Sequence, residues 1–279
     1  MRKLLVLCLV FFPTLSTNCL AAVRLPKIFA DNMVLQRELP IAVWGWADAG
    51  EEVTVSFNGQ TAQAEADTGG RWQVKLPAMK ADGKPHTLSV RGANEIVLQN
   101  ILLGEVWIAS GQSNMYRMAK VDGEHPNLRL AWRTQTESGH IPWKDDFGDT
   151  VKMGWCSATP ATLAATPKDV IRGKEVTRTQ YGEVAYVFGR KLHEELGVPV
   201  GMIHTAVGGS QAKSWTPRTD IEKEYPFGEK VEGTYLGHRD GLMYQCRIHP
   251  LVPMTVRGVI WYQGENDGRS TSEKYAADL

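Results

Sequence analysis

The chain has 279 residues, with 31 Lys and Arg balanced by 31 Asp and Glu, and 43% of its residues are hydrophobic. This is the composition of an ordinary globular protein. Zero net charge without a basic cluster argues against nucleic-acid binding, which depends on neutralising phosphates. No apolar run reaches the roughly 18–20 residues that a membrane-spanning helix needs, and nine Trp, eight Tyr and seven Phe argue against a disordered chain.

Residues 1–22 have the pattern of a secretory signal peptide. Arg2 and Lys3 precede an apolar run over residues 4–12, and small and polar residues follow, ending in Cys19-Leu20-Ala21-Ala22. This order of charged, apolar and small residues is typical of a segment that directs export and is then removed. We therefore expect an exported protein, periplasmic or extracellular. Beyond this segment Cys156 and Cys246 are the remaining cysteines, and they could form a disulfide or stay separate buried thiols.

Residues 23–103 predict a small β-sandwich domain. Residues 53–57 alternate with a period of two, and Asn58-Gly59 then supplies a hairpin turn. Further short strands are predicted at 41–46, 72–76, 86–90 and 95–98, separated by turn-rich stretches. Short strands at this spacing favour two small sheets packed face to face.

Residues 104–279 predict an α/β domain. The runs 105–109, 198–205 and 256–262 are nearly continuously apolar, as expected of strands that are covered on both faces. Residues 182–196 predict a helix whose apolar stripe contains Ala185, Phe188, Leu192 and Leu196, and Gly197 ends it. Strand, helix and strand in this order favour a parallel sheet. Residues 116–181 have no assignable pattern.

Each of the three predicted strands runs into a small polar loop. The loops contain Ser113, then Gly208-Gly209, then Gln263 to Asp267. Because the carboxyl ends of parallel strands meet at one edge of a sheet, we expect the three loops to converge there. Taken singly, a serine after a strand is more often a helix cap and a Gly-Gly pair a plain turn.

Together, these residue types suit acyl transfer. A serine on a tight turn can present its hydroxyl as a nucleophile. Glycine loops allow backbone N–H groups to approach an anionic oxygen, and an Asn amide adds another donor, which is the composition of an oxyanion hole.

Four stretches resemble the sialate O-acetylesterase family, carbohydrate esterases of the SGNH hydrolase superfamily. Residues 106–115 read VWIASGQSNM and residues 258–265 read GVIWYQGE. Residues 199–215 and residues 28–36, which read IFADNMVLQ, are similar to the family as well. The resemblance covers nearly the whole chain beyond residue 22.

The resemblance implies a flavodoxin-like, three-layer α/β sandwich and metal-free removal of acetyl groups from sugar hydroxyls, typically those of sialic acids. It implies Ser113 as the nucleophile, with its own N–H and that of Gly208 or Gly209 in the oxyanion hole. For the third donor, Asn266 matches the superfamily's Gly-x-Asn, whereas related esterases use the residue that matches Gln263. No cofactor is implied, and an acetylated glycan is the expected partner.

In this superfamily the general base comes from an Asp-x-x-His motif near the C-terminal end of the catalytic domain. No such motif follows the third loop, so we expect the catalytic His and Asp to be absent from this chain and the sandwich to be incomplete, as in a truncated protein. His204, at the end of the second strand, is the nearest substitute by topology, but a packed structural histidine is the favoured interpretation. His249 likewise resembles a structural element, and His193 lacks the second histidine of a zinc site.

Substrate contacts are predicted more weakly. Trp215 and Trp261 lie next to the site loops and could stack on a sugar, although a core role is favoured for both. Arg218 could meet a substrate carboxylate, and Glu265 is a further candidate. The rival hypothesis is a glycan-binding protein without catalysis, and the sequence leaves the oligomeric state open.

Overall fold

The computed structural model describes residues 22–116, 120–133, 141–148, 151–166, 169–171, 174–176, 182–231 and 236–267. The predicted signal peptide lies outside the described residues except for Ala22. The strands are β1 Val34–Gln36, β2 Ile41–Trp46, β3 Glu52–Phe57, β4 Gln60–Glu65, β5 Arg71–Leu76, β6 His86–Arg91, β7 Glu95–Gly111, β8 His125–Arg133, β9 Met153–Ala158, β10 Asp169–Ile171, β11 Lys174–Val176, β12 Val200–His204 and β13 Gly258–Tyr262. The helices are α1 Ser113–Tyr116, α2 Pro160–Ala164, α3 Glu183–Leu196 and α4 Ile221–Glu224, with shorter helical turns η1 Ala212–Trp215, η2 Leu236–His238, η3 Tyr244–Ile248, η4 His249–Leu251 and η5 Glu265–Asp267.

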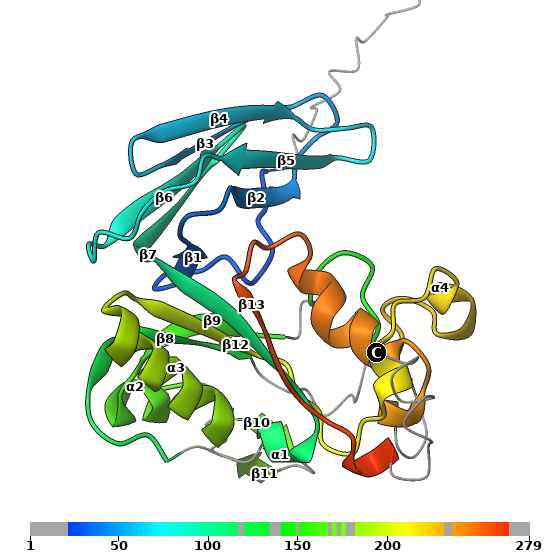
Figure 1. Cartoon of the computed structure of the whole chain (residues 1–279). Coiled ribbons are helices and arrows are strands. Elements are labelled where there is room, and N and C mark those ends of the chain that lie inside the picture. The colour runs from blue at the N-terminus through cyan, green and yellow to red at the C-terminus, as the bar shows by residue number, and fades with distance from the viewer. Residues whose placement is uncertain are drawn as a thin grey trace, which may run out of the picture.

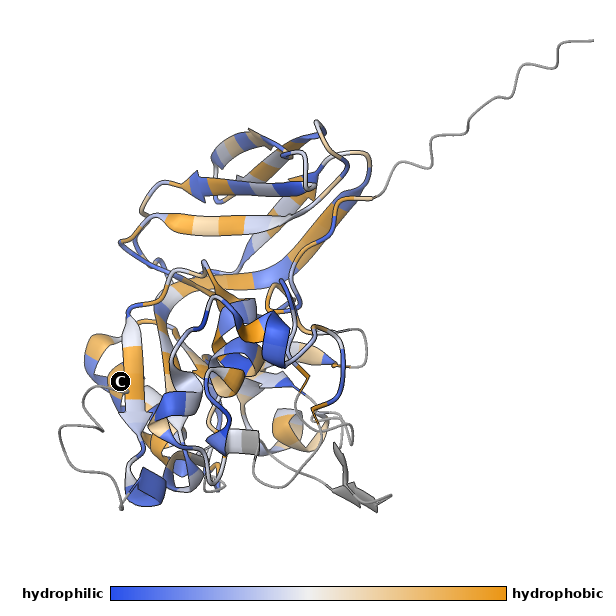
Figure 2. Cartoon of the chain, turned by 90° about the vertical axis from the view of Figure 1, so that its right-hand side faces the viewer, coloured by the Kyte–Doolittle hydropathy of each residue, from blue (hydrophilic) through white to orange (hydrophobic). Residues whose placement is uncertain are grey.

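The N-terminal part consists of strands, as the sequence predicts. β4, β3, β6 and the first half of β7 form one antiparallel sheet, and β2 pairs with β5 in another. Alternate residues of β3 and β5 are buried, and Phe57 and Trp72 share one hydrophobic core. Figure 2 shows this alternation as orange and blue bands along the upper strands. Positive φ angles at Asn58 (45°) and Gly59 (75°) form the predicted hairpin turn.

A single strand, β7, runs through both parts of the molecule (Figure 1). The sequence predicts two strands, at 95–98 and 105–109, but the structure has one strand of 17 residues. At Asn100 the backbone takes a φ of 58°, and the pairing with β6 is irregular beside it. This irregularity turns the strand out of the antiparallel sheet and into the α/β sheet, so the expected domain boundary at residue 103 falls within a strand.

The sheet of the second part has the order β13-β7-β12-β8-β9. The first four strands are parallel, and β9 runs antiparallel to β8. The three predicted strands are therefore direct neighbours, with β7 between the other two. β8 and β9 come from the stretch for which the sequence gives no assignable pattern.

Helix α3 covers one face of this sheet and confirms the predicted helix. Ala185, Tyr186 and Gly189 are buried, and the left-handed Gly197 (φ 64°) ends the helix. Leu196 departs from the predicted stripe because it lies at the helix end, where 44% of it is exposed. No helix among the described residues is long and apolar enough to cross a membrane.

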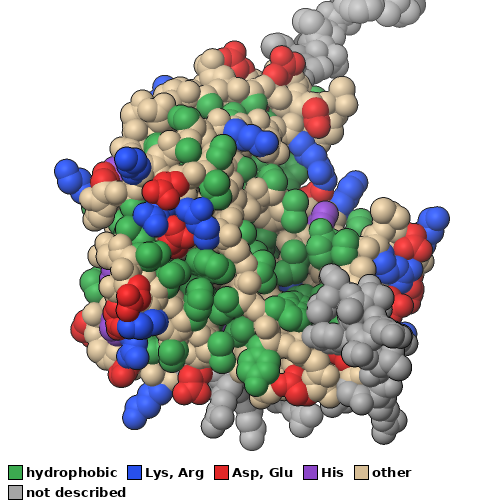
Figure 3. All heavy atoms as spheres, in the orientation of Figure 1, with side chains coloured by type: hydrophobic (Ala, Val, Ile, Leu, Met, Phe, Trp, Pro, Cys, Tyr) green, Lys and Arg blue, Asp and Glu red, His purple; other side chains and the backbone are tan. Residues whose placement is uncertain are grey.

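β13 has only β7 as a paired neighbour among the described strands. Its Val259 is 53% exposed and its Tyr262 is 45% exposed. Figure 3 shows hydrophobic side chains gathered on this face of the molecule, over the region of β13. The described structure thus leaves an apolar strand at the edge of a parallel sheet.

Both cysteines are free in the structure. Cys156 lies on β9 and Cys246 on η3, in different hydrophobic clusters. Burial raises the pKa of each thiol to about 12. The described structure therefore has two separate thiols, one of the two alternatives that the sequence leaves open.

Candidate active site

The first loop of the site is created by a glycine at the end of β7. Gly111 has a φ of 126°, and a Cβ atom at this position would lie 2.1 Å from the carbonyl oxygen of Tyr262. Gln112 N donates to the same oxygen over 2.9 Å. This close approach of β7 to β13 turns the chain sharply, and Ser113 follows as the exposed first residue of α1.

The second loop lies directly against the first. Thr205 N donates to Ala109 O (2.9 Å) and Val207 N donates to Gly111 O (3.0 Å), so the chain that follows β12 is held along the end of β7. A Cβ atom built on Gly208 would lie 3.9 Å from Cβ of Ser113. Ser113 and Gly208 are therefore side by side.

The third loop joins the other two through Asn266. Its side-chain Nδ2 donates to Gly209 O over 2.6 Å, and its backbone N donates to Gln112 Oε1 over 3.3 Å. Asn114 Nδ2 also donates to Glu265 Oε1. The three loops thus converge at the carboxyl ends of β12, β7 and β13, as the order of the strands requires.

Gln263 links the loops of the site through hydrogen bonds of its side chain. Its Nε2 donates to Ser210 O (3.1 Å) and to Asp267 Oδ2, and it lies 3.4 Å from Gln112 Oε1. Asp267 is 7% exposed, and its carboxylate also accepts from Ala212 N. Gln263 and Asp267 together form a polar clamp that fixes the second loop against the third.

The two tryptophans beside the site pack against each other. Trp215 is 8% exposed and donates from Nε1 to Ser210 Oγ over 2.9 Å. Its ring meets that of Trp261 edge to face, with centroids 5.4 Å apart. This arrangement supports the core role for Trp215, because little of its ring is available to a sugar.

Arg218 is engaged by two carboxylates. Its guanidinium binds Asp220 at 3.0 Å and Glu224 at 2.6 Å, and these hydrogen bonds raise its pKa further. Its contact with a substrate carboxylate stays a prediction, and such a substrate would have to compete with both acids.

His204 is a packed structural histidine. It is 8% exposed, and its Nε2 bonds to Met115 O over 3.1 Å. Burial lowers its pKa to about 4, so the ring is neutral at physiological pH and a weak base. His249 also has a structural contact, with Nε2 lying 2.6 Å from Lys144 O.

The structure also places His238 at the third loop of the site, although no sequence motif contains this histidine. This half-buried residue ends η2, and its Nε2 lies 2.6 Å from Nδ2 of Asn266. Nothing in the sequence around it indicates this position, because its partner lies 28 positions further along the chain.

One Asp-x-x-His sequence does occur, at Asp122-Gly123-Glu124-His125, upstream of the place where the superfamily has it. It leads into β8, whose first residue is His125, at the amino end of a parallel strand, whereas the loops of the site follow carboxyl ends. The Asp122 carboxylate binds Tyr186 and Arg190 of α3, and His125 Nε2 contacts the Asp122 carbonyl. These residues stabilise the start of β8 and are not part of the candidate site.

No group of three or more His, Cys, Asp or Glu side chains in the described part of the chain is arranged to hold a metal ion. The chemistry available at the three loops is that of a serine hydroxyl, glycine backbone N–H groups and carboxamides.

Comparisons with known proteins agree with this arrangement. A family model described as "Carbohydrate esterase, sialic acid-specific acetylesterase" matches residues 103–279. Human sialate O-acetylesterase is 26% identical over 281 residues, which cover 90% of this chain and 50% of the relative. The rat sialate O-acetylesterase is 26% identical over 298 residues, covering 89% and 53%. The chain spans about half the length of the curated relatives it matches.

A solved structure is similar in fold. The crystal structure of a carbohydrate acetylesterase from Xanthomonas citri superposes with a TM-score of 0.70 at 29% identity, covering 92% of this chain and 57% of that one. The mixed sheet with few helices is therefore an arrangement that a carbohydrate esterase also has.

Proposed function

The chain belongs to the sialic acid-specific acetylesterase family of carbohydrate esterases, and from this premise we propose that it removes acetyl esters from sugar hydroxyls by serine catalysis. The observation that carries the proposal is the contact of Ser113 with the Gly208 loop. It places a serine hydroxyl beside a glycine-rich backbone at the carboxyl edge of a parallel sheet.

In the proposed reaction, Ser113 Oγ attacks the acetyl carbonyl. The carbonyl oxygen becomes an oxyanion, which the backbone N–H groups of Ser113 and of Gly208 or Gly209 stabilise by hydrogen bonds. The sugar hydroxyl leaves with a proton, and water then releases acetate from the acyl-enzyme. Ser113 is exposed, so an acetyl group on a large glycan can reach it.

We assign the third oxyanion donor to Asn266 and a positioning role to Gln263. Asn266 Nδ2 reaches Gly209, which adjoins the glycine that faces Ser113. Gln263 points its Nε2 at Ser210 and Asp267 instead, where it holds two loops in register. Asn266 Nδ2 lies against Gly209 O and His238 Nε2, so in the proposed reaction it exchanges one of these bonds for a bond to the oxyanion.

The proposed reaction also needs a general base, which the family resemblance assigns to an Asp-x-x-His motif. A serine hydroxyl is a weak nucleophile at neutral pH without such a base. His204 does not supply it, because its pKa of about 4 and its bond to Met115 O make it a poor proton acceptor for Ser113.

Two finer inferences accompany the proposal. We take the sheet with α3 to be an SGNH-type sandwich and residues 23–103 to be a small β-sandwich domain. We also propose that the protein is exported, on the pattern of residues 1–22. O-acetylated sialic acid is the proposed substrate, on the strength of the relatives' names.

The test compares the protein with its Ser113→Ala variant, using 4-nitrophenyl acetate and 9-O-acetyl-N-acetylneuraminic acid. Loss of the nucleophile should lower kcat/KM at least about 10³-fold. Ser56→Ala, which removes a hydroxyl from β3, is the matched control and should leave the rate unchanged. Undiminished hydrolysis by the Ser113 variant would refute serine catalysis. Hydrolysis of the aryl ester without hydrolysis of the sialic acid ester would refute O-acetylated sialic acid as the substrate.

A further inference from the structure

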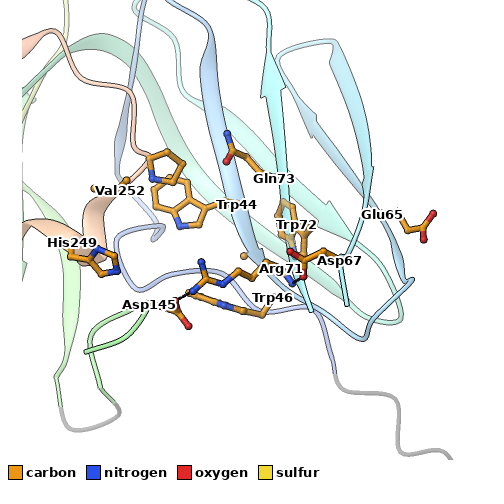
Figure 4. Close-up of a pocket in the computed structure, with 12 residues that line it drawn as sticks. Trp44, Trp46, Glu65, Asp67, Arg71, Trp72, Gln73, Asp145, His249 and Val252 are labelled. Carbon is orange, nitrogen blue, oxygen red and sulfur yellow. Dashed lines mark hydrogen bonds and ion pairs between the residues drawn. The ribbon is translucent and has the colours of Figure 1, made fainter. Parts of the chain in front are cut away.

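A cavity of about 510 Å³ lies between the β2–β5 sheet and the segment around His249 and Val252 (Figure 4). This volume is within the usual range for small-molecule sites. β2 lies in the upper part of the molecule in Figure 1, whereas α1, which begins with Ser113, lies at its lower end. The cavity is therefore separate from the candidate active site.

Three indole rings line the cavity. Trp44 and Trp72 are 7% and 3% exposed, and Trp46 is half-buried. Trp44 is held edge to face by Phe29, with centroids 4.8 Å apart, and the Arg24 guanidinium lies 5.3 Å from the Trp46 ring centroid. Trp44 and Trp72 therefore form the packed wall of the cavity, and the half-buried Trp46 is the ring among the three with surface left for a ligand. A fixed aromatic surface suits the C–H face of a sugar ring.

One polar atom of this wall has no partner. The Trp72 Nε1–H is buried and has no hydrogen-bond acceptor within the described part of the structure. Because this atom has no surface open to solvent, it belongs to the packed wall behind the cavity and is not a contact for a ligand.

The polar groups of the cavity are mostly hydrogen-bond acceptors. Asp67 and Asp145 contribute carboxylates and Gln73 a carboxamide, whereas the Glu65 side chain points away from the cavity (Figure 4). The one lining guanidinium, that of Arg71, is paired with Asp145. Carboxylates accept hydrogen bonds from hydroxyl groups but repel anions, so this lining favours a neutral polyol over a ligand that carries its own carboxylate.

We propose that this cavity is a second, non-catalytic glycan site that binds a neutral saccharide. The Trp46 ring contacts a sugar ring, and the Asp67 and Asp145 carboxylates with Gln73 accept from the sugar hydroxyls. The site goes beyond the proposed esterase function, because it holds a glycan at a place where no ester is cleaved.

Binding is tested by titrating the protein with xylohexaose, cellohexaose and mannohexaose, followed by tryptophan fluorescence and by calorimetry. At least one of these should bind saturably, with a Kd of about 1 mM or tighter. Trp46→Ala should weaken binding at least about 10-fold, and Trp46→Phe, which keeps a ring, should restore most of it. An α2,8-linked hexamer of N-acetylneuraminic acid should bind at least about 10-fold more weakly than the best neutral sugar.

Gln73→Ala provides a second variant that does not touch the packed rings. It should weaken binding a few-fold, whereas Gln63→Ala, on the neighbouring strand β4 outside the cavity, should leave binding unchanged. The hexasaccharides carry no acetyl ester, so the result is independent of whether Ser113 catalyses hydrolysis. The proposal is overturned if none of the neutral sugars binds, if both Trp46→Ala and Gln73→Ala bind like the unaltered protein, or if the anionic hexamer binds best.

Discussion

Glu105 offers the sharpest test of how the parts of this molecule are joined. The residue lies on β7 and is 3% exposed. Its carboxylate accepts from Arg37 Nε over 2.6 Å and from Arg257 Nε over 2.9 Å. Arg37 follows β1 and Arg257 precedes β13, so one buried carboxylate connects three strands.

Glu105→Gln keeps the shape of the side chain and removes its charge. Removing one partner of a buried ion pair costs about 3–5 kcal/mol, because the remaining charge is left without compensation. The side chains of Arg37 and Arg257 are 20% and 32% exposed, so water can partly replace the lost carboxylate. We therefore expect the free energy of unfolding to fall by about 2–3 kcal/mol at pH 7.

The effect should depend on pH with a definite sign. Burial alone would raise the pKa of Glu105, but hydrogen bonds from Arg257 and Arg37 outweigh burial and hold it below its usual 4.5. A carboxylate with a lowered pKa stabilises the folded state above its unfolded pKa, and this stabilisation is lost as the pH falls through the folded pKa. The difference between the two proteins should thus be constant from about pH 7 to pH 5 and shrink below 4.5.

Urea unfolding followed by tryptophan fluorescence measures both quantities. Glu95→Gln is the matched control, because Glu95 lies on the same strand, is exposed, and contacts Ser89 and Arg91. Its replacement should not measurably change the midpoint. Equal midpoints for the Glu105 variant and the unaltered protein at pH 7 would refute the reasoning, as would a difference that grows on acidification.

Two further predictions concern the candidate site. Gly111→Ala places a Cβ atom 2.1 Å from Tyr262 O at a φ of 126°. This substitution should lower the free energy of unfolding by about 2–6 kcal/mol, measured by urea unfolding, and should also reduce esterase activity. An unchanged urea midpoint would contradict the tight approach of β7 to β13. His204 has a pKa of about 4 in the folded protein against a usual 6.5, so the unfolded chain binds more protons between these two pH values. The free energy of unfolding should therefore fall by up to about 3 kcal/mol as the pH drops from 6.5 to 4. His204→Gln should remove this dependence in urea midpoints taken along the same pH series, and an identical slope in the variant would show that His204 is not its source.

Local patterns in the sequence predicted the elements that depend on local chemistry. The alternation of residues 53–57, the Asn58-Gly59 turn and the helix ended by Gly197 all have the expected form. The convergence of the three loops was predictable as well, because strand order and loop position together require it once the strands are parallel.

The features that sequence reasoning missed depend on long-range contacts. The sequence predicts separate strands at 95–98 and 105–109. In the structure the hydrogen bond from Asn100 Nδ2 to Asn32 Oδ1 and the pairing with β1 keep the strand continuous through Asn100, whose φ is 58°. β8 and β9 are held by their pairing and by the buried Trp155, whose Nε1 donates to Ile28 O. His238 reaches Asn266 only through the folded chain.

The continuity of β7 has a consequence for how the protein can be divided. Residues 102–104 pair with β1, and the core around Ile28 and Trp72 also contains Val106, Ile108 and Ile203 of the α/β sheet. A cut at residue 103 would therefore sever a strand and open a shared core. The two parts should melt as one cooperative unit, and an excised α/β region can keep its central strand whole only if it retains the N-terminal strands as well.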